Sequence, residues 1–134
     1  MTDIRIKDAA TLLGVSDDTV RRWIDSGTLA SFKDDAGRKV IAGDVLAAFV
    51  REQASPPADP TGASSSARNR FVGLVTEVTS DRVMSEVQMQ CGPFTVVSLM
   101  STASVDQLGL KPGALAVAVV KATNVIIETP GGTS

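Results

Sequence analysis

The chain has few of the residues that most enzymes and metal sites need. Its 134 residues include no histidine and a single cysteine, Cys91. A serine–histidine–aspartate triad, a histidine general base and a zinc site built on histidine or several cysteines are therefore excluded within one chain. Because no base is available to activate Cys91, we interpret it as an inert residue at a strand end. We expect no enzyme activity and no organic cofactor.

Long apolar runs and an excess of positive charge are also missing. No apolar stretch approaches the roughly 18 residues that a membrane helix needs, and the start does not resemble a signal sequence. Together with the lone cysteine, this favours a cytoplasmic protein with no membrane partner. The formal net charge is −2, so binding to nucleic acid would require a local basic patch.

A segment of low apolar content divides the chain. Residues 54–65 contain three prolines and no aliphatic side chain larger than alanine, a composition that predicts a semi-extended linker. Residues 1–53 have mainly helical patterns, residues 66–130 have mainly strand patterns, and residues 131–134 are expected to form a flexible tail. We therefore predict two small domains joined by a tether.

The first domain carries a succession of helix signals. Gly14 is expected to end one helix and Ser16 to cap the next, whose apolar face includes Trp23 as a core residue. Phe32-Lys33 and Val40-Ile41 flank a DDAGRK turn and predict a β-hairpin. A last helix is expected over residues 43–53. The side chains expected to face inward from the first and last helices are Ala9, Ala10, Leu12, Leu13, Val45, Leu46, Phe49 and Val50.

These elements together resemble a known DNA-binding fold. The stretch AATLLGVSDDTVRRWIDSGTL, followed by GRKVI and a closing helix, is similar to the winged helix-turn-helix of the MerR and excisionase families over residues 4–52. The resemblance implies an all-α domain with a short β-hairpin wing that binds double-stranded DNA, with the second helix in the major groove. The alternative for the arginines of that helix is a solvated face paired with the acidic residues beside them. The residues assigned by position to DNA contact are Ser16, Thr19, Arg21, Arg22, Arg38 and Lys39.

The second domain alternates in the manner of an antiparallel sheet. Five valine-rich runs are bounded by turn residues, and they lie at 71–79, 82–90, 94–100, 114–120 and 124–129. With one short helix, they predict a five-stranded OB-like β-barrel whose thin core favours association with another copy. Ser104 and Gln107 are interpreted as a capping box that opens the short helix. Ser101 precedes this helix start and Lys121 follows a strand, so hydroxyls, backbone amides and an ammonium group suggest an oxyanion pocket. The alternative is a simple cap and an ordinary surface lysine.

Three motifs in order make this domain similar to the molbindin domain, also called the molybdopterin-binding or TOBE-type domain. They are SARNRFVGLVTEV, MSTASVDQLGL and VKATNVIIE, and the resemblance covers about residues 66–130. It implies binding of molybdate or tungstate at sites between subunits or tandem copies. Ser101 stands where the family usually has threonine, and the serine keeps the hydroxyl group. The ligand residues that the resemblance implies are Ser66, Ala67, Arg68, Asn69, Ser101, Ser104, Lys121 and Ala122.

A DNA-reading module, a tether and an oxyanion-binding module together predict a one-component transcriptional regulator that responds to molybdate or tungstate. Since each chain has one copy of the second domain, we expect a homo-oligomer, either a dimer or a hexamer. The alternative is an intracellular molybdate storage protein without regulated DNA binding. A third possibility is a constitutive DNA-binding protein whose anion site is only structural.

Overall fold

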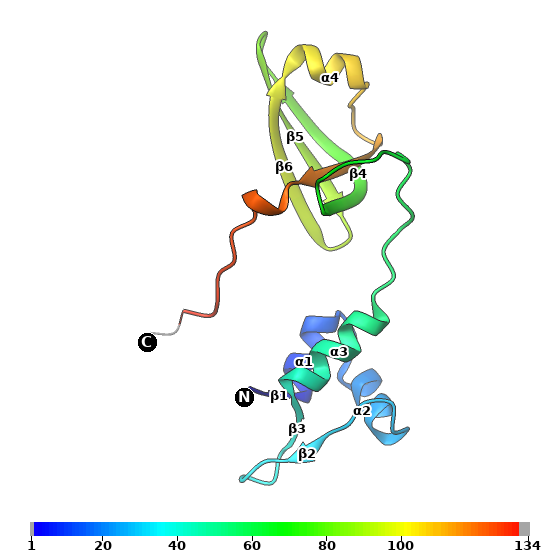
Figure 1. Cartoon of the computed structure of the whole chain (residues 1–134), viewed down its shortest axis with the longest axis vertical. Helices are drawn as coiled ribbons and strands as arrows, with labels where there is room; N and C mark the ends of the chain where they lie inside the picture. The colour runs from blue at the N-terminus through cyan, green and yellow to red at the C-terminus, as the bar shows by residue number, and fades with distance from the viewer. Residues whose placement is uncertain (1, 132–134) are drawn as a thin grey trace. The chain divides into compact units, whose positions relative to one another are not determined.

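The computed structural model describes residues 2–131, so of the tail expected at 131–134 all but the first residue lies outside them. The chain divides into two compact units after Ser55. Each unit has its own hydrophobic core. The two are therefore described separately (Figure 1).

The first unit combines three helices with a small antiparallel sheet whose strand order is β1-β3-β2. Strand β1 was not expected from the sequence, because its three residues are held only by pairing with β3, for example Ile4 opposite Ile41. The all-α prediction with a two-stranded wing is therefore corrected to three strands. The elements are β1 (Asp3–Arg5), α1 (Ile6–Leu13), α2 (Asp17–Asp25), β2 (Phe32–Lys33), β3 (Lys39–Ala42) and α3 (Gly43–Gln53).

Local signals place the ends of these helices as predicted. Gly14 follows α1 with φ of 68°, a left-handed conformation that glycine adopts without strain, and its N–H reaches the carbonyl oxygens of the last turn. Ser16 is the N-cap of α2, where its side-chain oxygen accepts a 3.2 Å hydrogen bond from the backbone N–H of Thr19.

The core of the first unit lies between the helices and β3. Trp23 packs against it, with its ring centroid 5.0 Å from that of Phe49, and this confirms it as a core residue. The prediction that Leu12 is buried was wrong, since 69% of its surface is exposed. Helix α1 instead presents an i, i+3, i+4, i+7 stripe to the core, and Leu12 lies off that stripe. Val45 and Val50 are exposed for the same reason. The stripe on α1 consists of Ile6, Ala9, Ala10 and Leu13.

The second unit is a four-stranded antiparallel sheet with one helix. Its strand order is β6-β5-β4-β7. The long strand β4 pairs with β7 through its first half and with β5 through its second half, and the register shifts between Val75 and Glu77. The elements are β4 (Asn69–Ser80), β5 (Met84–Cys91), β6 (Phe94–Ser101), α4 (Thr102–Leu108), β7 (Leu115–Val120) and a 3₁₀ turn, η1 (Ala122–Asn124).

The fifth predicted strand, at 124–129, is absent from the described structure. Beyond η1 the chain continues without strand pairing, and the orange-to-red segment in Figure 1 leaves the sheet. Ile126 and Ile127 are 85% and 81% exposed. The apolar β-branched pattern was recognised correctly, but a strand also needs a partner edge, and residues 2–131 provide none for it.

The core of the second unit is small. Its buried hydrophobic residues include Val75, Val105 and Cys91, which ends β5 as expected. Beside this core lies a hollow of about 440 Å³, lined mainly by aliphatic side chains of β6 and β7. An apolar hollow of this size leaves the unit with surface that a further apolar segment could cover.

Candidate functional site

The first and third molbindin motifs meet at one end of the sheet. Asn69 begins β4 and pairs with Val120, the last residue of β7. The side-chain amide of Asn69 donates a 3.1 Å hydrogen bond to the carbonyl oxygen of Val120. Lys121 and Ala122 follow at once, and Arg68 immediately precedes Asn69. The fold therefore brings Asn69 beside the Lys121 end of β7, although the two motifs are far apart in the sequence.

The charges at this end are not neutralised internally. Arg68 and Lys121 are exposed, and neither forms an ion pair with any residue in the described range. Ser66 is also exposed, whereas Ala67 and Asn69 are half-buried. We call the group of residues 66–69 with 121–122 the basic half-site, because it has two cations and no carboxylate among its members.

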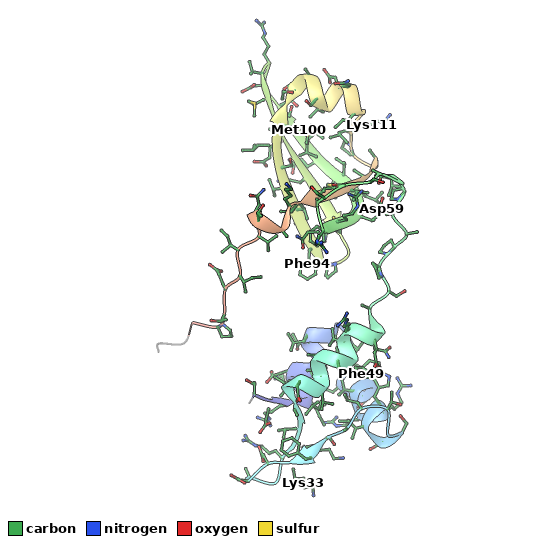
Figure 2. The ribbon with its side chains drawn as sticks, in the orientation of Figure 1. Lys33, Phe49, Asp59, Phe94, Met100 and Lys111 are labelled. Carbon is green, nitrogen blue, oxygen red and sulfur yellow. The ribbon has the colours of Figure 1, made fainter. Side chains whose placement is uncertain are left out.

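Arg70, next to this half-site, is already engaged. Its Nε lies 2.6 Å from Oδ2 of Asp59, labelled in Figure 2, and its Nη2 donates a 2.8 Å hydrogen bond to the Thr61 hydroxyl. Asp59 also accepts hydrogen bonds from the backbone N–H and the hydroxyl of Thr61. These contacts, which we call the linker latch, hold part of the segment between the domains onto β4. The DPTG turn pattern could have indicated a local fold there.

The linker latch should depend on the charge of Asp59. The Arg70 guanidinium, followed by the Thr61 hydroxyl and N–H, holds the pKa of Asp59 well below its usual range. A depressed pKa means that the latch is intact at neutral pH and is lost as the pH falls through the folded-state pKa. We expect D59N at pH 7 to increase the fast mobility of the Thr61 amide, measured by ¹⁵N relaxation, without unfolding the domain.

D106N is the matched control, because Asp106 is exposed and its carboxylate makes no hydrogen bond or ion pair among residues 2–131. It should leave the Thr61 amide unchanged. Equal mobility of that amide in D59N and the native chain would show that the latch does not order the segment.

The second molbindin motif forms a hydroxyl pair. Ser101 ends β6 and is the N-cap of α4, and its hydroxyl donates a 2.7 Å hydrogen bond to the Ser104 hydroxyl. The Ser104 backbone N–H donates in turn to the Ser101 hydroxyl oxygen at 3.1 Å. The predicted capping box starting at Ser104 was therefore wrong by one turn. Pairing of Ser101 with Met84 ends the strand there, so the helix begins immediately afterwards.

The hydroxyl pair and the basic half-site lie near different ends of β4. Asn69 is the first residue of this 12-residue strand and Ser80 is the last. The basic half-site includes Asn69. Ser101 lies near the other end, because Ser80 pairs with Ser85 on β5 and the adjacent Met84 pairs with Ser101. Within one chain, the fold therefore does not assemble all the predicted ligand residues into a single site.

The candidate DNA-contacting residues fall into two groups. At the start of α2, the Ser16 and Thr19 hydroxyls lie 3.0 Å apart, and Arg22 donates a 3.2 Å hydrogen bond from Nη2 to the Thr19 hydroxyl. Arg21 makes only a long 3.8 Å contact with Asp18, and both side chains are largely exposed. Exposed pairs of this kind contribute little to stability, so Arg21 can change partners at low cost.

The wing carries the other two candidates. Asp34 accepts hydrogen bonds from the backbone N–H groups of Ala36 and Arg38, and its carboxylate also binds Nε of Arg38 at 3.1 Å. Because the backbone N–H of Arg38 donates to it, the pKa of Asp34 is lowered, and the turn holds its charged acceptor at neutral pH. Lys39 follows at the start of β3 and is exposed. Arg5 and Lys7, which the sequence-based reasoning missed, line a hollow with Arg21, Arg38 and Lys39.

The described residues contain neither a metal cluster nor a membrane helix. Among residues 2–131, no three His, Cys, Asp or Glu side chains gather where they could hold a metal ion. None of the helices in that range combines the length and the hydrophobicity that crossing a bilayer needs.

Comparison with known proteins identifies both units. Residues 4–54 match the helix-turn-helix domain family, and residues 65–127 match the TOBE domain family. Molybdenum-pterin-binding protein 2 of Clostridium pasteurianum is 42% identical over 65 residues, which are 48% of this chain and 96% of that protein. Molybdenum-pterin-binding protein 3 of the same organism is 40% identical over 65 residues, with the same shares.

A solved structure agrees with these matches. The cytoplasmic molybdate-binding protein ModG, in a form with molybdate bound, is 40% identical at a TM-score of 0.50, and the match covers 54% of this chain and 52% of that chain. The fold is thus that of a helix-turn-helix domain joined to a small β domain. The chain belongs to the TOBE-domain, or molbindin, family, as its three motifs predicted.

Proposed function

We propose that this chain binds molybdate or tungstate through its second unit and acts as a cytoplasmic one-component transcriptional regulator through its first. Two observations support the proposal. The relatives of the second unit are molybdenum-pterin-binding and molybdate-binding proteins. The first unit matches a helix-turn-helix domain and exposes cations on α2 and the wing. We propose likewise that the first unit is a MerR-like winged helix-turn-helix domain.

The chemistry of the basic half-site suits a dianion. Arg68 can donate charge-assisted hydrogen bonds from a planar fork, and Lys121 supplies a flexible point charge. The Ser101 and Ser104 hydroxyls add neutral donors. Since the proposed ligand set contains no carboxylate, it offers no repulsion to an oxyanion and no general base. This favours reversible binding over catalysis.

A complete site then needs two copies of the chain. The basic half-site and the hydroxyl pair adjoin opposite ends of β4, so one chain offers two incomplete clusters. A second copy can bring its hydroxyl pair to the basic half-site of the first. This proposal explains why each cluster is exposed or half-buried in the single chain.

The surface of the second unit supports association with another copy. Ile126 and Ile127 are almost fully exposed, and the sheet of the same unit has an aliphatic hollow. Burying one isoleucine side chain contributes about 1.5–3 kcal/mol, so leaving both in water forfeits a substantial part of the stability of a small domain. We propose that the chain is a homo-oligomer, at least a dimer, in which this segment is covered.

Oxyanion binding between two copies of the chain would set the spacing of their two helix-turn-helix domains. The anion must bind the DNA-competent arrangement more tightly than the other arrangement, because equal affinity would shift no population. Storage of molybdate is the alternative function, and the presence of a helix-turn-helix domain with exposed cations argues against storage as the whole role.

Two measurements on the full chain test the proposal. Calorimetric titrations with molybdate, tungstate and sulfate should show binding of the first two and weaker binding of sulfate. A gel shift on the DNA upstream of the gene should then change when the better ligand is added. Molybdate binding with no retention of DNA would support storage, and DNA binding that ignores molybdate would reduce the anion site to a structural role.

A further inference from the structure

Most of the positively charged side chains of the first unit line one hollow. It has a volume of about 340 Å³ and lies among the β1–α1 junction, the start of α2 and the wing. Its wall includes residues from segments far apart in the sequence, which is why no sequence motif reveals it. The lining residues are Arg5, Ile6, Lys7, Asp17, Arg21, Arg38 and Lys39.

The segregation of charge is the main evidence. Residues 1–53 contain eight Lys or Arg and nine Asp or Glu, so the unit as a whole has a net charge of −1. Five of those eight cations line the hollow, but only one of the nine acids, Asp17, does so. A random placement on an acidic domain would mix the signs. The local charge of the lining is +4, which favours a polyanion.

The cations of the hollow are largely available. Among residues 2–131, Arg5, Lys7 and Lys39 form no ion pair, and Arg21 has only its 3.8 Å contact with Asp18. Arg38 uses Nε to bind Asp34, and this contact holds the wing turn without using its terminal nitrogens. Three cations, from β1, α1 and β3, therefore have no acidic partner at short range among the described residues, and Arg38 adds the terminal nitrogens that its pair with Asp34 does not use.

The start of α1 adds backbone donors to the same place. Arg5 is the N-cap residue, and no side chain caps this helix start. The free N–H groups of a first helical turn carry partial positive charge and favour an anion nearby. Arg5, Ile6 and Lys7 all line the hollow, so this helix start lies beside the five cationic side chains. Asp8 is the acidic residue in its first turn.

We propose that this hollow is a seat for a backbone phosphate of double-stranded DNA, with Arg5 and Lys7 as contact residues in addition to those on α2 and the wing. The inference rests on the proposed DNA-binding function and deepens it. A phosphate held beside the start of α2 would fix the register of that helix on the duplex without reading sequence. Its contribution should therefore be the same for every sequence and should depend on salt.

The test uses fluorescence anisotropy of the full chain with a labelled 30-base-pair duplex of random sequence, between 50 and 200 mM KCl. We expect the double variant R5A/K7A to bind about 10-fold more weakly at the lower salt, and the slope of log K against log salt to become shallower by about 1–2 units. Both side chains are exposed, so the melting temperature should not change.

The matched control is R51A/R82A, which removes two exposed cations outside the hollow and should keep the native slope. If the native chain binds the duplex and R5A/K7A keeps the native affinity and slope, the phosphate seat is wrong while the proposed function stands. If the native chain binds no duplex at all, both fail. Loss of molybdate binding in R5A/K7A with unchanged duplex binding would also overturn the seat, because the hollow would then hold a free oxyanion.

Discussion

Replacing both Arg68 and Lys121 by alanine should weaken molybdate binding by about 100-fold or more. Each side chain is expected to donate charge-assisted hydrogen bonds, which contribute about 1.5–3 kcal/mol apiece, and every 1.4 kcal/mol is about tenfold in affinity. Both side chains are exposed and carry no internal ion pair within residues 2–131, so the fold should survive. Calorimetric titration of the full chain with molybdate measures the effect, and thermal unfolding checks the fold.

The control for this prediction is R82A/K111A, which removes the same charge from exposed positions of the second unit outside the half-site. It should lower molybdate affinity by no more than a small factor, through the long-range field alone. If R68A/K121A and the control bind molybdate equally well, the assignment of the basic half-site is wrong.

Changing Ile126 and Ile127 to serine should dissociate the proposed homo-oligomer. The two side chains are 85% and 81% exposed in the single chain, and their burial in an assembly would contribute about 3–6 kcal/mol per copy. Losing it should raise the dissociation constant at least about 100-fold. Size-exclusion chromatography with light scattering across a range of protein concentrations measures the change. Each chain should remain folded, because neither residue contributes to the core of its own unit.

A double variant of two other exposed apolar residues, L12S/V83S, is the control, since these are 69% and 66% exposed and lie outside the 125–127 segment. It should keep the native mass. An unchanged oligomer in I126S/I127S would show that this segment does not hold the copies together.

The two variants together test whether the anion site lies between copies. R68A/K121A should lose molybdate binding but remain oligomeric, whereas I126S/I127S should lose both. This pattern follows because the basic half-site and the hydroxyl pair adjoin opposite ends of β4. A monomeric I126S/I127S chain that still binds molybdate with native affinity would place the complete site within one chain.

Local features of the fold could be read from the sequence because their causes are local. Gly14 allows a left-handed turn, and the Ser16 side chain reaches the N–H of Thr19 within the same helical turn. Helix α3 has the predicted ends, Gly43 and Gln53. At Gly14 and Ser16 the interacting groups lie within a few residues of one another, so residue type and spacing carry the information.

Features that depend on distant partners were missed or misplaced. Strand β1 exists only through β3, and the predicted strand at 124–129 finds no partner in the part of its chain that the structure describes. The cap of α4 moved to Ser101, because the pairing of that residue with Met84 decides where β6 ends. An apolar alternating pattern indicates a tendency to form a β-strand, but hydrogen bonding to another segment decides whether the strand forms.

The sequence by itself determined the two-domain organisation, the helix-turn-helix core and the molbindin family, because motifs and helix caps are short-range patterns of residue type. Only the tertiary structure decided which functional groups meet. Pairing of β4 with β7 brings Asn69 to the Lys121 end of β7 and keeps Ser101 away from both, and packing of β1, α2 and the wing surrounds one hollow with five cations. Such groupings arise from contacts between residues distant in the chain, which spacing alone does not encode.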